Sequence, residues 1–111
     1  MNEKIMEEAM SIIMSAGDAR ESCRQAIDCL MADDYQKAEA LIKTADNQIA
    51  QAHHIQTDCI QAAIGGEEFA YNVLFAHAQD TLMTIYSEIG LVRNMMRLYR
   101  RLDEKIRTAN F

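Results

Sequence analysis

The segment FAYNVLFAHAQDTLMTIYSEIGLV, residues 69–92, decides the fold of this chain. Its apolar residues recur at alternating three- and four-residue steps, which is the spacing of one face of an α-helix. The pattern continues beyond the segment and predicts a long helix over about 68–107. The resulting stripe comprises Tyr71, Phe75, Ala78, Leu82, Ile85, Ile89, Val92, Met96 and Tyr99.

The same predicted helix has a second apolar side. Between Phe69 and Val92 only Asp80 and Glu88 carry formal charges. The second side comprises Phe69, Val73, Ala76, Met83 and Leu91. A helix that is apolar nearly all round is normally buried all round, yet two partner helices cover only one of its sides. We therefore expect another copy of the chain to cover the second side, which predicts a homo-oligomer.

Two further helices precede this one, because the chain is punctuated only at Asp33-Asp34 and at Gly65-Gly66-Glu67-Glu68. The first block predicts a helix over 3–31, with Arg20 at the one polar step of its stripe. The other members of that stripe are Met6, Ala9, Ile13, Ala16, Cys23, Ile27 and Leu30.

The second block predicts a helix over 34–64, with Asp33 as its N-cap and Gly65-Gly66 as its end. Its stripe is Ala38, Ile42, Ala45, Ile49, Ala52, Gln56, Cys59 and Ala63. Because most of these side chains are small, neighbouring helices can approach closely. A single antiparallel three-helix bundle over residues 1–111 accommodates all three helices.

The composition narrows the classes of function. The chain has 111 residues and no proline; half of its residues are hydrophobic and a quarter are charged. Such a chain is too apolar for a disordered segment and too charged for a membrane protein. The net charge of −6 disfavours nucleic acid as a partner, since no basic cluster is longer than Arg100-Arg101.

The cysteines and the first residues suggest an intracellular protein. Cys23, Cys29 and Cys59 are odd in number and form no CxxC motif, so we expect reduced cysteines that pack in the core. The first ten residues, MNEKIMEEAM, lack the cationic start and apolar core of a signal peptide. The predicted location is the cytoplasm.

Four segments resemble one known family. FAHAQDTLM at 75–83 is similar to the signature HxQDHLM of the lactose/cellobiose-type IIA component of the bacterial sugar phosphotransferase system. SAGDAR at 15–20 resembles its NAGEAR segment, AHHIQT at 52–57 its AHxxQT segment, and GGEE at 65–68 its SGE turn. The matches occur in order over about residues 6 to 100 and fall in all three predicted helices.

The resemblance implies a cytoplasmic homotrimer of three-helix subunits, a nine-helix bundle. Each subunit would bear a histidine that accepts phosphate from the phosphocarrier protein HPr and passes it to a cysteine of the IIB component. The phosphate then reaches an incoming disaccharide, so the link to the membrane component IIC is indirect. By the motif, the histidine is His77, which would form a tele-phosphohistidine, and no nucleotide takes part.

The same motif implies a role for two neighbours of His77. Asp80 would lie at the trimer axis and bind one divalent metal, such as magnesium, per trimer. Thr81 stands where the family usually has a second histidine. A threonine in that place would have to act as a neutral hydrogen-bond donor.

The chemistry of a phosphoryl relay suits these residues. Imidazole, with an unperturbed pKa of about 6.5, is nucleophilic near pH 7 and also leaves readily. The protein mainly positions donor and acceptor, because the transition state of the transfer is loose. Gln79 is a candidate orienting group, and since residues two apart on a helix point in different directions, we expect it to serve the histidine of a neighbouring subunit.

Taken without the family, the residues leave alternatives open. His77 and Asp80 would be interface polar groups in a non-catalytic helical assembly module, or ligands in a small metal-binding bundle. The metal bundle is disfavoured because the chain lacks paired Glu-x-x-His motifs. Arg20 either approaches a phosphoryl group or buried carboxylate, or packs its stem and extends its head to water. His53 is either structural or near the active histidine, and His53-His54 is not a metal pair.

Overall fold

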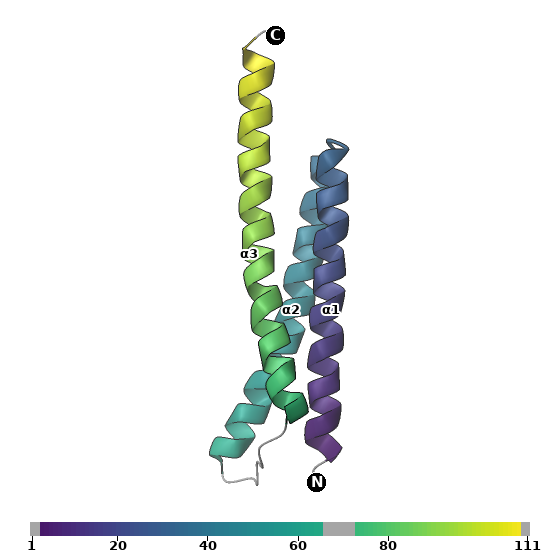
Figure 1. Cartoon of the computed structure of the whole chain (residues 1–111), viewed down its shortest axis with the longest axis vertical. Coiled ribbons are helices and arrows are strands. Elements are labelled where there is room, and N and C mark those ends of the chain that lie inside the picture. The colour runs from purple at the N-terminus through teal and green to yellow at the C-terminus, as the bar shows by residue number, and fades with distance from the viewer. Residues whose placement is uncertain (1–2, 66–72, 110–111) are drawn as a thin grey trace.

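The computed structural model describes residues 3–65 and 73–109. They form three α-helices, α1 (Glu3–Met31), α2 (Tyr35–Ile64) and α3 (Val73–Thr108). In Figure 1, α1 and α3 run in the same direction and α2 runs antiparallel to both, in a rod of 65 × 19 × 18 Å. The prediction of an all-α, antiparallel three-helix subunit is confirmed. Across the described ranges, no helix combines the length and the apolar character needed to cross a membrane.

The turn between α1 and α2 differs from the prediction in one detail. Asp34 is the N-cap of α2, where its side chain accepts a hydrogen bond from the backbone N–H of Lys37 at 3.1 Å. Asp33 has a φ of 62° and lies in the left-handed region, which is tolerated by aspartate better than by most residues. It closes the turn, and its N–H donates to the carbonyl of Leu30 at 2.9 Å. The assignment of the cap to Asp33 was therefore wrong by one residue.

The other helix ends agree with the sequence pattern. The predicted range 3–31 is the range of α1, and Gly65 ends α2 with its N–H donating to the carbonyl of Gln61 at 2.9 Å. α3 ends at Thr108, one residue beyond the predicted end. The predicted start of this helix at 68, together with the turn residues 66–68, lies outside the described residues.

The core lies along the axis of the rod and follows most of the predicted stripes of α2 and α3. Ala63 and Val92 are only partly buried, Tyr99 is 36% exposed, and Tyr71 lies outside the described residues. Ile12, Leu82 and Ile85 are the largest fully buried side chains, and each contributes about 1.5–3 kcal/mol through burial. Small residues let the helices approach closely, as expected. Completely buried alanines are Ala9, Ala16, Ala19, Ala26, Ala38, Ala45, Ala52 and Ala78.

The predicted stripe of α1 was partly wrong. Met6 is 37% exposed, and Ile13 and Ile27 are only partly buried, while Ile5 and Ile12 are buried instead. α1 packs against both α2 and α3, so its buried arc is wide and centred about one residue away from the predicted stripe.

Candidate functional site

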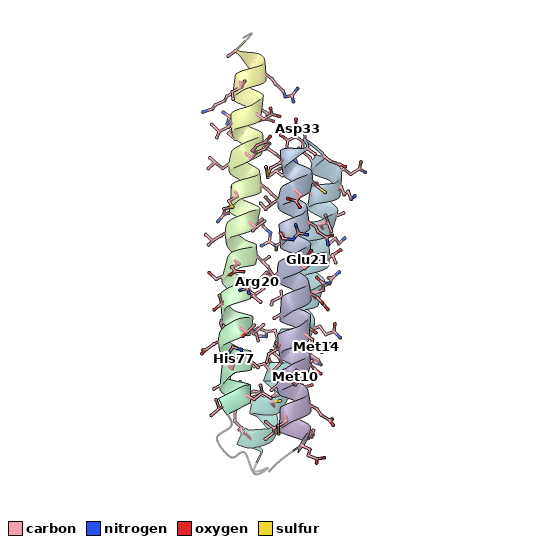
Figure 2. All side chains as sticks on the ribbon, turned by 45° about the vertical axis from the view of Figure 1, so that its right-hand side comes forward. Met10, Met14, Arg20, Glu21, Asp33 and His77 are labelled. Carbon is pink, nitrogen blue, oxygen red and sulfur yellow. The ribbon has the colours of Figure 1, made fainter. Side chains whose placement is uncertain are left out.

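His77 lies near the start of α3 with an exposed side chain. It is toward the same end of the bundle as Met10 and Met14 of α1 (Figure 2). Within the described part of the chain, its imidazole has no hydrogen-bond, ion-pair or ring partner. Both ring nitrogens are therefore accessible to an incoming group.

His77 lies on the side of α3 that faces α1. Glu88 follows it by eleven residues, which is three helical turns plus about 20°, so the two side chains share a side. Glu88 accepts two hydrogen bonds from Arg20 of α1, at 2.9 Å from Nε and 3.0 Å from Nη2. We call this side of α3, defined by His77 and Glu88, the α1 flank.

Gln79 lies on the opposite side, toward α2. Its Oε1 accepts a hydrogen bond from Nε2 of Gln56 at 3.3 Å. Tyr86 and Arg93 follow at seven-residue steps and also meet α2, Arg93 through an ion pair with Asp46. We call this side, defined by Gln79, Tyr86 and Arg93, the α2 flank. Because about 200° of helix separates it from His77, the two site residues of one chain point apart.

Asp80 lies between the two flanks on what we call the open face of α3, defined by Val73, Asp80, Met83, Leu91 and Leu98. Its four apolar members are between 52% and 71% exposed. Of the predicted second side, Val73, Met83 and Leu91 therefore have little cover within one chain, Ala76 is partly buried, and Phe69 lies outside the described residues. In residues 3–65 and 73–109 no group of three or more His, Cys, Asp or Glu side chains gathers to hold a metal. A single chain thus offers one carboxylate here, and a cation site at Asp80 requires further copies.

Thr81 turns its hydroxyl back onto its own helix. Its Oγ1 donates to the carbonyl of His77 at 2.9 Å, the usual back-bond of a helical threonine. The single hydroxyl hydrogen is therefore occupied in this conformation. A role as a donor to phosphate would require the hydroxyl to turn away from that carbonyl.

Comparison with known proteins identifies the family. Residues 7–100 match the family described as PTS system, lactose/cellobiose specific IIA subunit. The chain belongs to this family. The family assignment made from the four sequence segments is thereby confirmed.

Relatives of this IIA subunit share most of its length. It is 35% identical over 102 residues to the PTS system lactose-specific EIIA component of Lacticaseibacillus casei, covering 92% of this chain and 91% of that protein. The crystal structure of the cellobiose-specific enzyme IIA from Bacillus anthracis is similar with a TM-score of 0.87 and 30% identity, over 95% and 96% of the two chains. The solution structure of the IIA(Chitobiose)–HPr complex from Escherichia coli is similar with a TM-score of 0.79 and 25% identity, covering 89% of this chain and 96% of that chain.

Arg20 of this IIA subunit extends its head to the surface. Its side chain is 53% exposed, and the bidentate bond to Glu88 raises the pKa of its guanidinium. Since Glu88 is eleven residues from His77, the ion pair lies about 16 Å along α3 from the histidine. The alternative of a packed stem with an exposed head fits this position, since the carboxylate that Arg20 contacts, Glu88, is itself 41% exposed.

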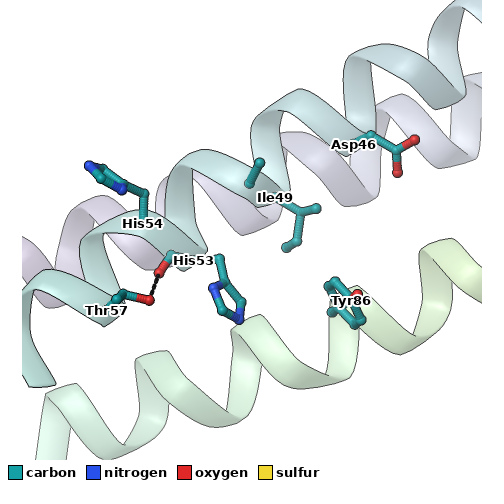
Figure 3. Close-up of a pocket in the computed structure, with 7 residues that line it drawn as sticks. Asp46, Ile49, His53, His54, Thr57 and Tyr86 are labelled. Carbon is teal, nitrogen blue, oxygen red and sulfur yellow. Dashed lines mark hydrogen bonds between the residues drawn. The ribbon is translucent and has the colours of Figure 1, made fainter.

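A groove of about 460 Å³ opens between α2 and α3 of the IIA subunit. His53 and Tyr86 point into it from opposite helices, with ring centroids 6.4 Å apart. His54 also lines the groove, although its ring is directed away from α3 (Figure 3). His54 instead lies 3.5 Å from Asp58. Sequence reasoning missed this groove, although Tyr86, an aromatic residue off the core stripe, was a signal for it.

The cysteines of the IIA subunit take no part in this site. All three are free, and Cys23 and Cys59 are buried. Burial raises the pKa of the Cys59 thiol to about 12, assisted by its hydrogen bond to Glu8 at 2.6 Å. A neutral thiol is a poor nucleophile, which is consistent with a packing role.

Proposed function

We propose that this IIA subunit carries a phosphoryl group on Nε2 of His77 between HPr and a cysteine of a IIB component during sugar uptake in the cytoplasm. The observation that carries the proposal is the exposed imidazole of His77, which has no partner in residues 3–65 and 73–109 and lies inside the family-matched residues 7–100. Similarity to a IIA protein solved in complex with HPr supports HPr as the donor. The link to the membrane component IIC is through IIB.

The relay consists of two balanced displacements. The neutral imidazole nitrogen of His77 attacks the phosphorus of phospho-HPr, so one N–P bond forms while the donor's N–P bond breaks. The thiolate of IIB then attacks the same phosphorus, an S–P bond forms, and His77 returns to its free state. Because each transition state is loose, in-line placement and neutral donors to the phosphoryl oxygens are the main requirements.

The proposal includes a homotrimer built on the open face of α3. Covering an exposed apolar side chain such as Leu91 or Leu98 provides about 1–2 kcal/mol each. In a parallel cyclic arrangement the three Asp80 carboxylates converge on the axis, where they repel one another unless a cation or a proton lies between them. A magnesium ion held by the three Asp80 side chains would supply that neutralisation.

The alternative is a non-catalytic homo-oligomeric assembly module. The open face fits both functions equally well, because it needs a partner in either case. Phosphorylation distinguishes them, because only a phosphoryl carrier forms a phosphohistidine at His77. The exposed imidazole of His77, which has no partner among the described residues, can accept a phosphoryl group.

Phosphorylation in vitro tests the function. With phosphoenolpyruvate, enzyme I and HPr, we expect one acid-labile, base-stable phosphate per chain. His77→Ala should abolish labelling, and His54→Ala should retain it, because His54 is also exposed but lies on α2 beside Asp58. Absence of label on the wild-type protein, or label that persists in His77→Ala, would exclude the phosphoryl-carrier function.

A further inference from the structure

We infer that Gln56 is a positioning residue, which fixes the amide of Gln79 so that its NH₂ group faces the His77 of the neighbouring subunit. The inference rests on the proposed function and adds to it a residue that never touches the phosphate. Gln56 is only 8% exposed and lies in the core stripe of α2, where the other members are apolar or cysteine. A buried amide at this place needs a hydrogen-bond partner, and that partner is Gln79.

The contact between the two amides has a direction. Nε2 of Gln56 donates to Oε1 of Gln79 at 3.3 Å. A glutamine amide has one carbonyl oxygen that accepts and one NH₂ group that donates. With the carbonyl oxygen of half-buried Gln79 directed at Gln56, the NH₂ group occupies the other end of the amide.

The arrangement of the flanks brings this NH₂ group to a second chain. The α1 flank and the α2 flank lie on either side of the open face. A cyclic assembly around that face sets the α1 flank of one subunit against the α2 flank of the next. His77 therefore meets the flank of its neighbour that bears Gln79.

His77 of one subunit and Gln79 of the next also lie at nearly the same level along the assembly axis. In a parallel cyclic assembly each residue keeps its level along the axis, and His77 and Gln79 are two residues apart, which is about 3 Å. Arg20 does not compete for this place, since its partner Glu88 lies eleven residues further along α3. Gln79 of the neighbour is thus at the level of the phosphorylated ring.

The orientation of the amide decides its effect on the transfer. An NH₂ group donates to a phosphoryl oxygen without adding charge, and so stabilises both the phosphohistidine and the transition state. A reversed amide would present its carbonyl oxygen to the same phosphoryl oxygens and repel them. In the structure Gln56 offers its NH₂ group to Oε1 of Gln79, which corresponds to the first orientation.

Gln56→Glu tests the inference, because an ionised carboxylate only accepts hydrogen bonds and would draw the NH₂ group of Gln79 toward itself. We expect the kcat of transfer from phospho-HPr to fall roughly tenfold with KM unchanged, and the ³¹P resonance of the phosphohistidine to shift. The matched control is Gln48→Glu on the same helix, where Oε1 of Gln48 accepts from Oγ of Ser22 at 2.7 Å, toward α1. That control should keep the wild-type kcat and resonance.

Two further variants keep the test decisive. Gln56→Met removes the donor without adding charge, and a lowered kcat with a shifted ³¹P resonance in this variant supports the inference even if Gln56→Glu does not fold. In the Gln79→Ala background neither substitution of Gln56 should lower kcat further, because Gln56 acts through Gln79. If the Gln56 variants keep the wild-type kcat and ³¹P resonance, the inference is overturned and the proposed function stands. If the wild-type protein takes no label on His77, both the inference and the proposed function are overturned.

Discussion

The hydroxyl of Tyr35 donates a hydrogen bond to Oδ2 of Asp103 at 2.8 Å and so joins the first residue of α2 to the last turns of α3. Arg107 donates to the same carboxylate at 3.0 Å, and Arg100 lies over the Tyr35 ring at 4.9 Å. Figure 1 shows why these contacts matter, since α3 extends beyond the turn between α1 and α2. Together with the hydrogen bond from Tyr99 to Asp33 at 3.0 Å and the ion pair of Arg100 with Glu39, they hold this end of α3 to the bundle.

Tyr35→Phe should lower the melting temperature by a few degrees, because it removes this hydrogen bond and leaves the ring in place. Thermal unfolding followed by circular dichroism measures the change. Tyr86→Phe is the control, since the Tyr86 ring is 56% exposed and its hydroxyl has no hydrogen-bond partner within the described residues. Equal melting temperatures for the two variants would contradict the proposed role of Tyr35.

The same contact predicts a loss of stability in alkali. Desolvation raises the pKa of the Tyr35 hydroxyl to about 12, with the hydrogen bond to Asp103 as the next cause. A raised pKa in the folded state means that the neutral phenol favours folding. Its contribution is complete below the unfolded pKa of about 10 and is lost as the pH rises from there through 12. The melting temperature of the wild type should therefore fall more steeply between pH 9 and pH 12.5 than that of Tyr35→Phe.

Much of the fold was predictable from hydrophobic spacing, because each helix carries one strong period. The stripes of α2 and α3 have a single buried direction, so residues such as Ile42 and Leu82 were placed correctly. The stripe of α1 was predicted partly wrongly, because that helix is buried against two neighbours and Ile5 and Ile12 share the core with Ala9 and Ala16. Asp33 was misassigned because either of two adjacent aspartates makes a good cap, and only the backbone decides between them.

The site was predictable in part. The motif placed His77, Gln79 and Asp80 on one helix, and helical geometry alone separates the first two by about 200°. The contact of Gln79 with Gln56 was not predictable, because it depends on how far α2 is shifted along α3. The groove at His53 and Tyr86 depends on the same shift.

Leu91→Glu should weaken the proposed trimer, because it places a charge on the apolar open face of α3, where Leu91 is 59% exposed. Sedimentation equilibrium should give about three times 12.6 kDa for the wild type and a lower average mass for the variant at micromolar concentration. Met14→Glu is the control, since Met14 of α1 is 65% exposed and lies away from the open face. A monomeric wild type would exclude the trimer, and a dimer would exclude its threefold axis.

Asp80→Asn tests the proposed cation at the axis. In the proposed trimer, three converging carboxylates would make the wild type dependent on a cation, whereas three amides would not repel one another. EDTA should therefore lower the melting temperature of the wild type, and magnesium should restore it, with no response in Asp80→Asn. The variant should also be the more stable of the two in EDTA. An equal response of both proteins to EDTA would exclude a cation site at Asp80.

Thr81→Val separates two uses of the threonine hydroxyl. In the structure its hydrogen is donated to the carbonyl of His77 at 2.9 Å, so it is not directed at a phosphoryl oxygen. We therefore expect the variant to accept phosphate from HPr within about twofold of the wild-type rate, since a helical back-bond of this kind adds little stability. Thr44→Val is the matched control, because Oγ1 of Thr44 makes the same back-bond to the carbonyl of Ala40 at 3.1 Å, far from His77 in the sequence. A fall of tenfold or more in Thr81→Val, with Thr44→Val unaffected, would instead mean that the hydroxyl turns toward the phosphate and supplies the neutral donor in place of the family's usual histidine.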